Sequence, residues 1–147
     1  MNELKIYTNS PEETMELGMK ISHLPKGTIV LLSGDLGAGK TTLVRGAAKG
    51  LNIQDVVQSP TFNIMKIYLK GDRPLIHIDA YRLADINDDI GLDEYIGYES
   101  GITFIEWPMY IENLIPSDHL EVEIKRINDE EREITIKGKE EILELLK

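Results

Sequence analysis

Residues 28–42 read Thr28-Ile29-Val30-Leu31-Leu32-Ser33-Gly34-Asp35-Leu36-Gly37-Ala38-Gly39-Lys40-Thr41-Thr42. The first six form a nearly continuous apolar run of strand length, which is typical of a strand covered on both faces of a sheet. A glycine-rich turn follows it. Residues 40–49 then repeat apolar side chains at helical spacing and end at Gly50, which we expect to cap the helix. The order strand, loop, helix predicts an α/β fold.

The turn matches the P-loop pattern G-x-x-x-x-G-K-[ST] at every fixed position, from Gly34 to Thr41. Average residue usage gives a chance match in roughly one chain of this length in a few hundred, so coincidence is a weak explanation. A glycine-rich strand-to-helix junction also directs backbone N–H groups and the helix dipole at phosphate. If the segment were only a tight strand-to-helix turn, nothing would require Lys40 and Thr41 at these positions. The motif therefore predicts a nucleotide-binding site.

Each residue type in the motif suits phosphate chemistry. The glycines permit positive φ and a close backbone approach to oxygen atoms. Lys40 is expected to bridge the β- and γ-phosphates, and the Thr41 hydroxyl to ligate Mg²⁺. Thr42 can offer its backbone N–H to the α-phosphate. The loop residues predicted to contact the nucleotide are Asp35, Leu36, Gly37, Ala38, Gly39, Lys40, Thr41 and Thr42.

Two apolar segments, residues 75–78 and 102–105, are each followed by an acidic residue, Asp79 and Glu106. Strand ends beside a P-loop point into the nucleotide crevice, so either carboxylate can serve as the second metal ligand or as the group that positions water. The sequence does not show which of the two carboxylates binds the metal and which positions water.

Four further residues have two interpretations each. Thr61, in Ser59-Pro60-Thr61-Phe62, occupies the place of a switch threonine that senses the γ-phosphate, or it belongs to an ordinary turn. Arg82 either neutralises charge during phosphoryl transfer or forms a surface salt bridge. Trp107 either stacks in the site or packs. We expect His77 to be a strand residue satisfied by backbone groups rather than a zinc ligand, since no Cys or paired His supports such a site.

The remaining elements indicate a mixed sheet in a three-layer α/β domain of the P-loop NTPase type, flanked by helices and spanning residues 1–147. Ser10, Pro11 and Glu13 begin a helix as N-cap, first residue and capping-box partner. Alternating or apolar segments predict two antiparallel hairpins. The expected segments are strands 63–69 with 75–78 and 120–124 with 133–137, helices 109–114 and 140–146, and short helices near 85–90 and 92–96 within the acidic stretch 83–100.

Composition narrows the function further. The chain has 147 residues, 41% hydrophobic and 29% charged, with 16 Lys and Arg against 26 Asp and Glu for a net charge of −10. This acidic balance disfavours a surface that holds nucleic acid unaided, so we expect any contact with nucleic acid to be indirect. The absence of Cys excludes disulfides and thiolate sites. No apolar run approaches the ~20 residues of a membrane span, and we expect a cytoplasmic protein without membrane contact.

The ordered motifs resemble the TsaE family, the small ATPases of bacterial tRNA threonylcarbamoyladenosine biosynthesis. The family set is the P-loop through Thr42, then Ser59-Pro60-Thr61-Phe62, His77-Ile78-Asp79-Ala80-Tyr81-Arg82-Leu83 and Glu106-Trp107-Pro108. The resemblance implies that Lys40 and Thr41 bind phosphate and Mg²⁺, that Thr61 lies in a switch loop, that Asp79 and Glu106 serve the metal and the hydrolytic water, and that Trp107 borders the nucleotide. Ala80 and Met109 depart from the family's common Leu and Glu.

The resemblance also implies a partnership and a reaction. ATP and Mg²⁺ would be the cofactors, and TsaD and TsaB would be the partners that modify adenosine 37 of tRNAs reading codons that begin with A. ATP hydrolysis would permit their repeated turnover. Two other classes stay open. A small-molecule P-loop kinase is disfavoured because no Arg-rich lid is visible, and a non-catalytic nucleotide-dependent binding module would retain partner function without Asp79 or Glu106.

Overall fold

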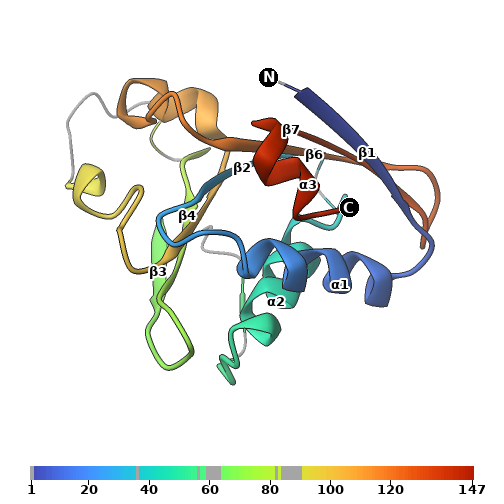
Figure 1. Ribbon diagram of the computed structural model, residues 1–147, viewed down its shortest axis with the longest axis horizontal. Coiled ribbons are helices and arrows are strands. Elements are labelled where there is room, and N and C mark those ends of the chain that lie inside the picture. Colours follow the sequence, from blue (N-terminus) through green and yellow to red (C-terminus); the bar gives the residue numbers. More distant parts are fainter. Residues whose placement is uncertain (1, 36, 56, 59–63, 82, 84–90) are drawn as a thin grey trace.

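The structure is a computed structural model that describes residues 2–35, 37–55, 57–58, 64–81, 83 and 91–147. The described residues form one seven-stranded sheet in the order β1-β7-β6-β2-β5-β4-β3, with helices packed against it (Figure 1). In chain order the elements are β1 (Asn2–Thr8), α1 (Pro11–Ser22), β2 (Ile29–Ser33), α2 (Lys40–Gly50), β3 (Met65–Tyr68), β4 (Leu75–Asp79), η2 (Leu92–Glu94), β5 (Ile102–Glu106), η3 (Pro108–Leu114), β6 (Leu120–Arg126), β7 (Arg132–Gly138) and α3 (Glu140–Glu144).

The sheet is mixed, as predicted. Strand β2 lies at its centre and pairs in parallel with both β5 and β6, and β4 continues the parallel part beside β5. Antiparallel pairs β3–β4 and β6–β7 confirm the two expected hairpins. Because β2, β4 and β5 run the same way, their carboxyl ends meet at one edge of the sheet. The P-loop leaves from that edge.

Strand β1 is an element that the sequence patterns above do not predict. It pairs antiparallel with β7 along its whole length, from Asn2 opposite Gly138 to Thr8 opposite Arg132. Leu4 and Ile6 pack against the core, while Lys5 between them is exposed. An edge strand that buries only one face carries a weak hydrophobic signal, and its pairing partner is distant in sequence.

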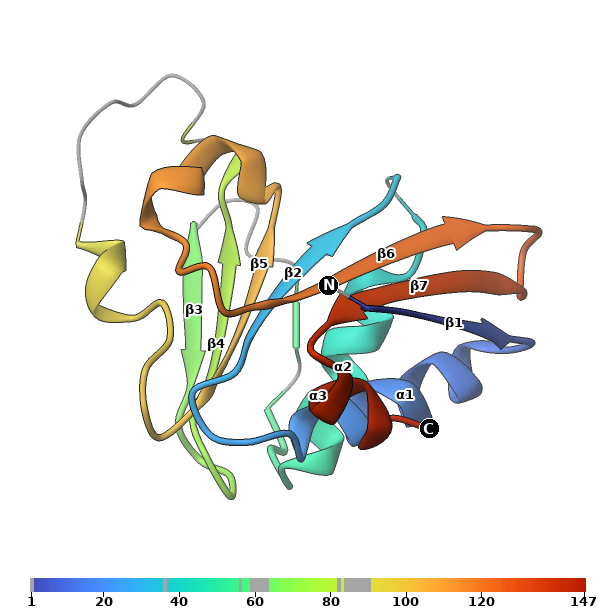
Figure 2. The ribbon, with the colours of Figure 1, turned by 45° about the horizontal axis from the view of Figure 1, so that its top comes forward.

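Helices α1 and α2 pack side by side over one face of the sheet (Figures 1 and 2). The predicted start of α1 is confirmed: the Ser10 hydroxyl accepts a hydrogen bond from the Glu13 N–H at 3.2 Å, and the Glu13 carboxylate accepts one from the Asn9 N–H at 3.0 Å. Helix α3 is shorter than the predicted 140–146.

The role predicted for Gly50 is wrong. Helix α2 includes Gly50, and its C-cap is Leu51, with Asn52 in the left-handed region at φ 60°. A Cβ on Gly50 would lie 2.4 Å from the Ser22 Oγ of α1. The glycine therefore permits close helix packing rather than ending the helix.

Two apolar clusters cover the two faces of the parallel strands. The larger includes Val30, Leu43 and Phe104 and lies between the sheet and the α-helices. The smaller includes Ile78, Ile105 and Ile111 and lies under the segments that contain η2 and η3. The helices predicted near 92–96 and over 109–114 are 3-10 helices in the structure.

The short helix predicted near 85–90 lies outside the described residues. No described helix is long and apolar enough to cross a bilayer.

Candidate nucleotide-binding site

The glycine-rich loop joins the carboxyl end of β2 to the N terminus of α2. Gly34, Gly37 and Gly39 have φ of 146°, 80° and 111°, so all three lie in the region that favours glycine. A Cβ on Gly34 would also meet the Ile124 carbonyl oxygen at 2.5 Å. Gly39 is the N-cap of α2 and supplies no side chain to its first-turn N–H groups. Uncapped N–H groups at a helix start are suited to an anion.

Lys40 is the first residue of α2, and the residue is 8% exposed. Its Nζ donates a hydrogen bond to the Gly34 carbonyl at 2.9 Å and lies 3.7 Å from Oε1 of Glu106. The ammonium is also 4.9 Å from the centroid of the Trp107 ring, within the range of a cation–π contact. The predicted phosphate lysine therefore meets a carboxylate from β5 at the mouth of the loop.

Asp79 and Glu106 are brought together by strand register. They are opposite each other at the ends of parallel strands β4 and β5, so their side chains share a face of the sheet. Both are buried. The Asp79 Oδ1 accepts a hydrogen bond from the Tyr81 N–H at 3.0 Å, which closes the turn after β4. The two predicted acidic residues thus lie beside each other, and Glu106 also faces Lys40.

His77 differs from the prediction. Its Nε2 is 2.7 Å from Oε2 of Glu106, so its partner is a side chain and not the backbone. Its Nδ1 has no hydrogen-bond partner among the described residues. A buried, unpaired N–H costs more than an unpaired lone pair, so we assign the proton to Nε2, which donates to the Glu106 carboxylate. No sequence pattern indicates this pair, because it depends on the register between β4 and β5.

Trp107 follows Glu106 with φ 57° and ψ 51°, a left-handed conformation that is unusual for a bulky residue. It lines a cavity of about 330 Å³ together with Gly34, Asp35, Lys40 and Met109. Its ring also packs on Tyr81, with centroids 5.3 Å apart. Trp107 therefore packs on Tyr81 and also lines the cavity beside the loop, and its stacking on a nucleotide stays a prediction.

The remaining candidates are only partly placed. Thr41 and Thr42 lie half-buried in the first turn of α2. Leu36, Thr61 and Arg82 lie outside the described residues. Among the described residues, no three His, Cys, Asp or Glu side chains gather as a cation site. Two carboxylates and a hydroxyl fit Mg²⁺ that is completed by phosphate oxygens and water, which is how this ion commonly binds beside nucleotides.

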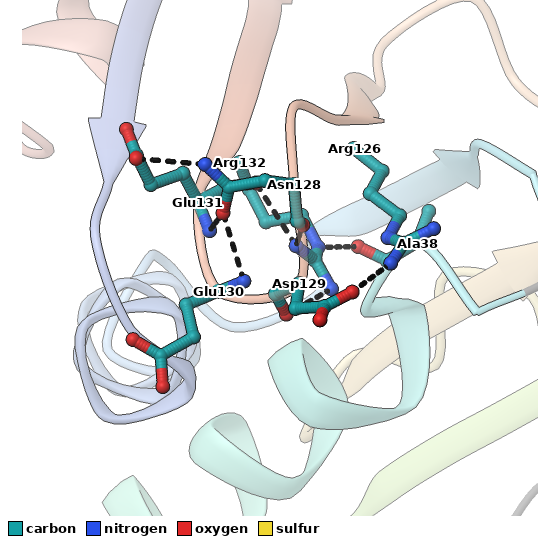
Figure 3. Close-up of polar contacts among 7 residues, drawn as sticks. All are labelled: Ala38, Arg126, Asn128, Asp129, Glu130, Glu131 and Arg132. Atoms are coloured by element: carbon teal, nitrogen blue, oxygen red, sulfur yellow. Dashed lines mark hydrogen bonds and ion pairs between the residues drawn. The ribbon is translucent and has the colours of Figure 1, made fainter.

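Arg132 is a contact of the loop that sequence patterns did not single out. From the start of β7 its Nε donates to the Ala38 carbonyl at 2.7 Å, although the two residues are 94 positions apart (Figure 3). Its other N–H groups bind the turn between β6 and β7. The P-loop is thus hydrogen-bonded to the opposite half of the sheet.

The chain is similar to known proteins along most of its length. The family model "Threonylcarbamoyl adenosine biosynthesis protein TsaE" matches residues 8–134. The chain belongs to the TsaE family. The TsaE match includes the P-loop, both acidic strand ends and Arg132. The chain is 46% identical to the tRNA threonylcarbamoyladenosine biosynthesis protein TsaE of Bacillus subtilis, and the alignment covers 92% of this chain and 85% of that protein.

Two further similarities extend along most of the chain. The TsaE protein of Treponema pallidum is 36% identical, over 90% of this chain and 99% of that protein. The crystal structure of Bacillus subtilis YdiB superimposes with a TM-score of 0.80 at 38% identity, covering 98% of this chain and 91% of the other. The α/β fold expected from the sequence is therefore confirmed.

Proposed function

We propose that this chain is a Mg²⁺-dependent ATPase that acts in tRNA threonylcarbamoyladenosine biosynthesis. The observation that carries the proposal is the position of the Lys40 ammonium, 2.9 Å from the Gly34 carbonyl and 3.7 Å from the Glu106 carboxylate, at the uncapped start of α2. A cation and free helix N–H groups beside a carboxylate suit a metal-bound triphosphate.

Binding would begin at the loop. Backbone N–H groups of the loop and of the first turn of α2 would hold the phosphates, because the positive φ of the glycines allows N–H groups to face inward. The β- and γ-phosphate oxygens carry formal charge, so they are stronger acceptors for Lys40 than the neutral Gly34 carbonyl. Trp107 would border the nucleotide from the wall of the adjacent cavity.

Mg²⁺, when bound, neutralises charge that develops on the phosphate oxygens. The Thr41 hydroxyl and one carboxylate of the Asp79–Glu106 pair would hold it. The other carboxylate would orient a water molecule for attack on the γ-phosphorus. The bond from that phosphorus to the β–γ bridging oxygen breaks, and the products are ADP and inorganic phosphate.

The proposed partners are TsaD and TsaB. Support comes from the names of the relatives, which are tRNA threonylcarbamoyladenosine biosynthesis proteins, and from the net charge of −10. An acidic protein repels the phosphodiester backbone, so the partners would hold the tRNA. ATP hydrolysis by this chain would permit their repeated turnover. We propose that it acts in the cytoplasm.

The test is ATP turnover by the purified chain, alone and with TsaB and TsaD. We expect slow release of phosphate by the chain alone and faster release in the complex, because switch segments hold catalytic groups loosely without a partner. The Glu106→Gln and Asp79→Asn variants should lower turnover in both conditions. Nucleotide binding without phosphate release in either condition would contradict the ATPase and favour a non-catalytic binding module.

A further inference from the structure

We propose that Arg132 is a positioning residue that fixes the phosphate loop and ties it to the β6–β7 turn. The proposal rests on nucleotide binding at the loop, as proposed above. Arg132 does not touch the nucleotide in this scheme: it acts through the Ala38 carbonyl, and its role is to hold one peptide unit in the orientation that phosphate requires.

The guanidinium group is bound entirely to backbone carbonyls. Besides Nε to Ala38 at 2.7 Å, Nη1 donates to the carbonyls of Asn128 at 2.6 Å and Glu131 at 2.9 Å, and Nη2 to that of Asp129 at 3.3 Å (Figure 3). These acceptors lie on two segments that are remote in sequence. Arg132 therefore links the phosphate loop to the β6–β7 turn by hydrogen bonds to carbonyls of both segments.

The bond to Ala38 determines where the next N–H points. The carbonyl of Ala38 and the N–H of Gly39 belong to the same planar trans peptide unit, so they point in opposite directions. In an anion-binding loop the N–H groups converge inward and the carbonyls face outward. Holding the Ala38 carbonyl outward against β7 therefore keeps the Gly39 N–H turned away from β7, toward the inside of the loop.

The turn that carries Arg132 is itself ordered. The Asn128 Oδ1 accepts hydrogen bonds from the N–H groups of Glu130 at 3.0 Å and Glu131 at 2.9 Å, and its Nδ2 donates to the Glu131 carboxylate at 2.8 Å. These bonds fix the carbonyls that receive Nη1 and Nη2. Arg126 lies in the same hairpin, paired with the exposed Asp129, and none of the contacts described for it reaches the loop.

The chain thus offers a matched pair of arginines. Arg132→Ala and Arg126→Ala remove the same charge from the same hairpin, but only the first removes the bond to Ala38. Arg132→Lys keeps the charge, yet a single ammonium cannot reproduce a planar fork that reaches both segments. We measure ATP affinity in the presence of Mg²⁺ for the full chain and its three variants.

A second readout does not require nucleotide. The Ala38 N–H donates to the Asp35 carbonyl at 2.9 Å inside the loop, whereas the Leu43 N–H donates to the Gly39 carbonyl at 3.0 Å in the first turn of α2. Amide hydrogen exchange at Ala38 therefore reports loop order, and exchange at Leu43 reports whether α2 is intact. Both are followed by NMR in each variant.

We expect Arg132→Ala and Arg132→Lys to weaken ATP binding roughly tenfold and to speed exchange at Ala38 but not at Leu43, while Arg126→Ala resembles the parent chain. Wild-type affinity and exchange in Arg132→Ala would overturn the positioning role, as would full rescue by Arg132→Lys, which would make the charge decisive. If the parent chain does not bind ATP, the proposed function fails, and exchange at Ala38 still decides whether Arg132 holds the loop.

Discussion

The imidazole of His77 holds the carboxylate of Glu106 from inside the sheet, with Nε2 2.7 Å from Oε2 and the histidine side chain fully buried. The other oxygen of the same carboxylate faces the Lys40 ammonium at 3.7 Å. Glu106 is therefore fixed from two sides, by the imidazole of His77 from β4 and by the ammonium of Lys40 from the P-loop. A carboxylate held in this way has little freedom to rotate.

This arrangement predicts that His77→Leu lowers the turnover number for ATP by about tenfold or more while ATP affinity changes much less. Loss of a hydrogen bond to a buried charged group costs about 1.5–3 kcal/mol, and the loss falls on the orientation of Glu106 rather than on the loop. Steady-state turnover and titration of Trp107 fluorescence measure the two quantities separately.

His77→Gln is the matched control, because its amide N–H can donate to Glu106. It should recover part of the turnover that His77→Leu loses. If both variants turn over ATP at the parent rate, the positioning of Glu106 by His77 is not needed. If both lose binding and activity together, the histidine serves the fold and not the site.

Thr41→Ala should weaken ATP binding more in Mg²⁺ than in EDTA. The variant removes the proposed metal ligand but keeps every backbone N–H of the loop. Isothermal titration of the parent chain and of the variant, each with and without the metal, gives the four affinities that are needed. Equal losses in both conditions would count against a metal role for this hydroxyl.

The interface between α1 and α2 predicts a strong effect of Gly46→Ala on stability. A Cβ at this position would lie 2.1 Å from the Met15 carbonyl oxygen, so the helices must separate. Overpacking of this kind costs typically about 1–3 kcal/mol, against a gain of up to about 1 kcal/mol in helix propensity. Urea unfolding followed by circular dichroism should show a lower midpoint. A variant as stable as the parent would show that the helices adjust freely.

Much of the site could be predicted because its signals are local. The P-loop, its flanking strand and its helix lie within residues 28–50, and spacing alone indicates their order. Asp79 and Glu106 could be proposed because each ends an apolar strand. Their meeting depends on parallel pairing, and the rule that parallel strand ends share one edge was sufficient to anticipate it.

The contacts that sequence patterns missed are all non-local. The His77–Glu106 pair depends on the register between β4 and β5, and Arg132 reaches Ala38 across the sheet. Strand β1 finds its partner only at β7. The prediction for Gly50 is wrong because the sequence pattern is the same for a glycine that ends a helix and for one that allows a second helix to pack closely. Only the position of α1 distinguishes the two roles.

The central claim, that the loop seats the phosphates of ATP with the help of Lys40, is tested most directly by calorimetry of ATP and Mg²⁺ against the parent chain, Lys40→Ala and Lys49→Ala. Lys49 is exposed in the last turn of the same helix and controls for charge. We predict saturable heat for the parent chain and for Lys49→Ala, and at least a tenfold loss of affinity for Lys40→Ala with an unchanged circular dichroism spectrum. No binding heat from the folded parent chain at millimolar ATP, or equal affinity in all three proteins, would contradict the claim.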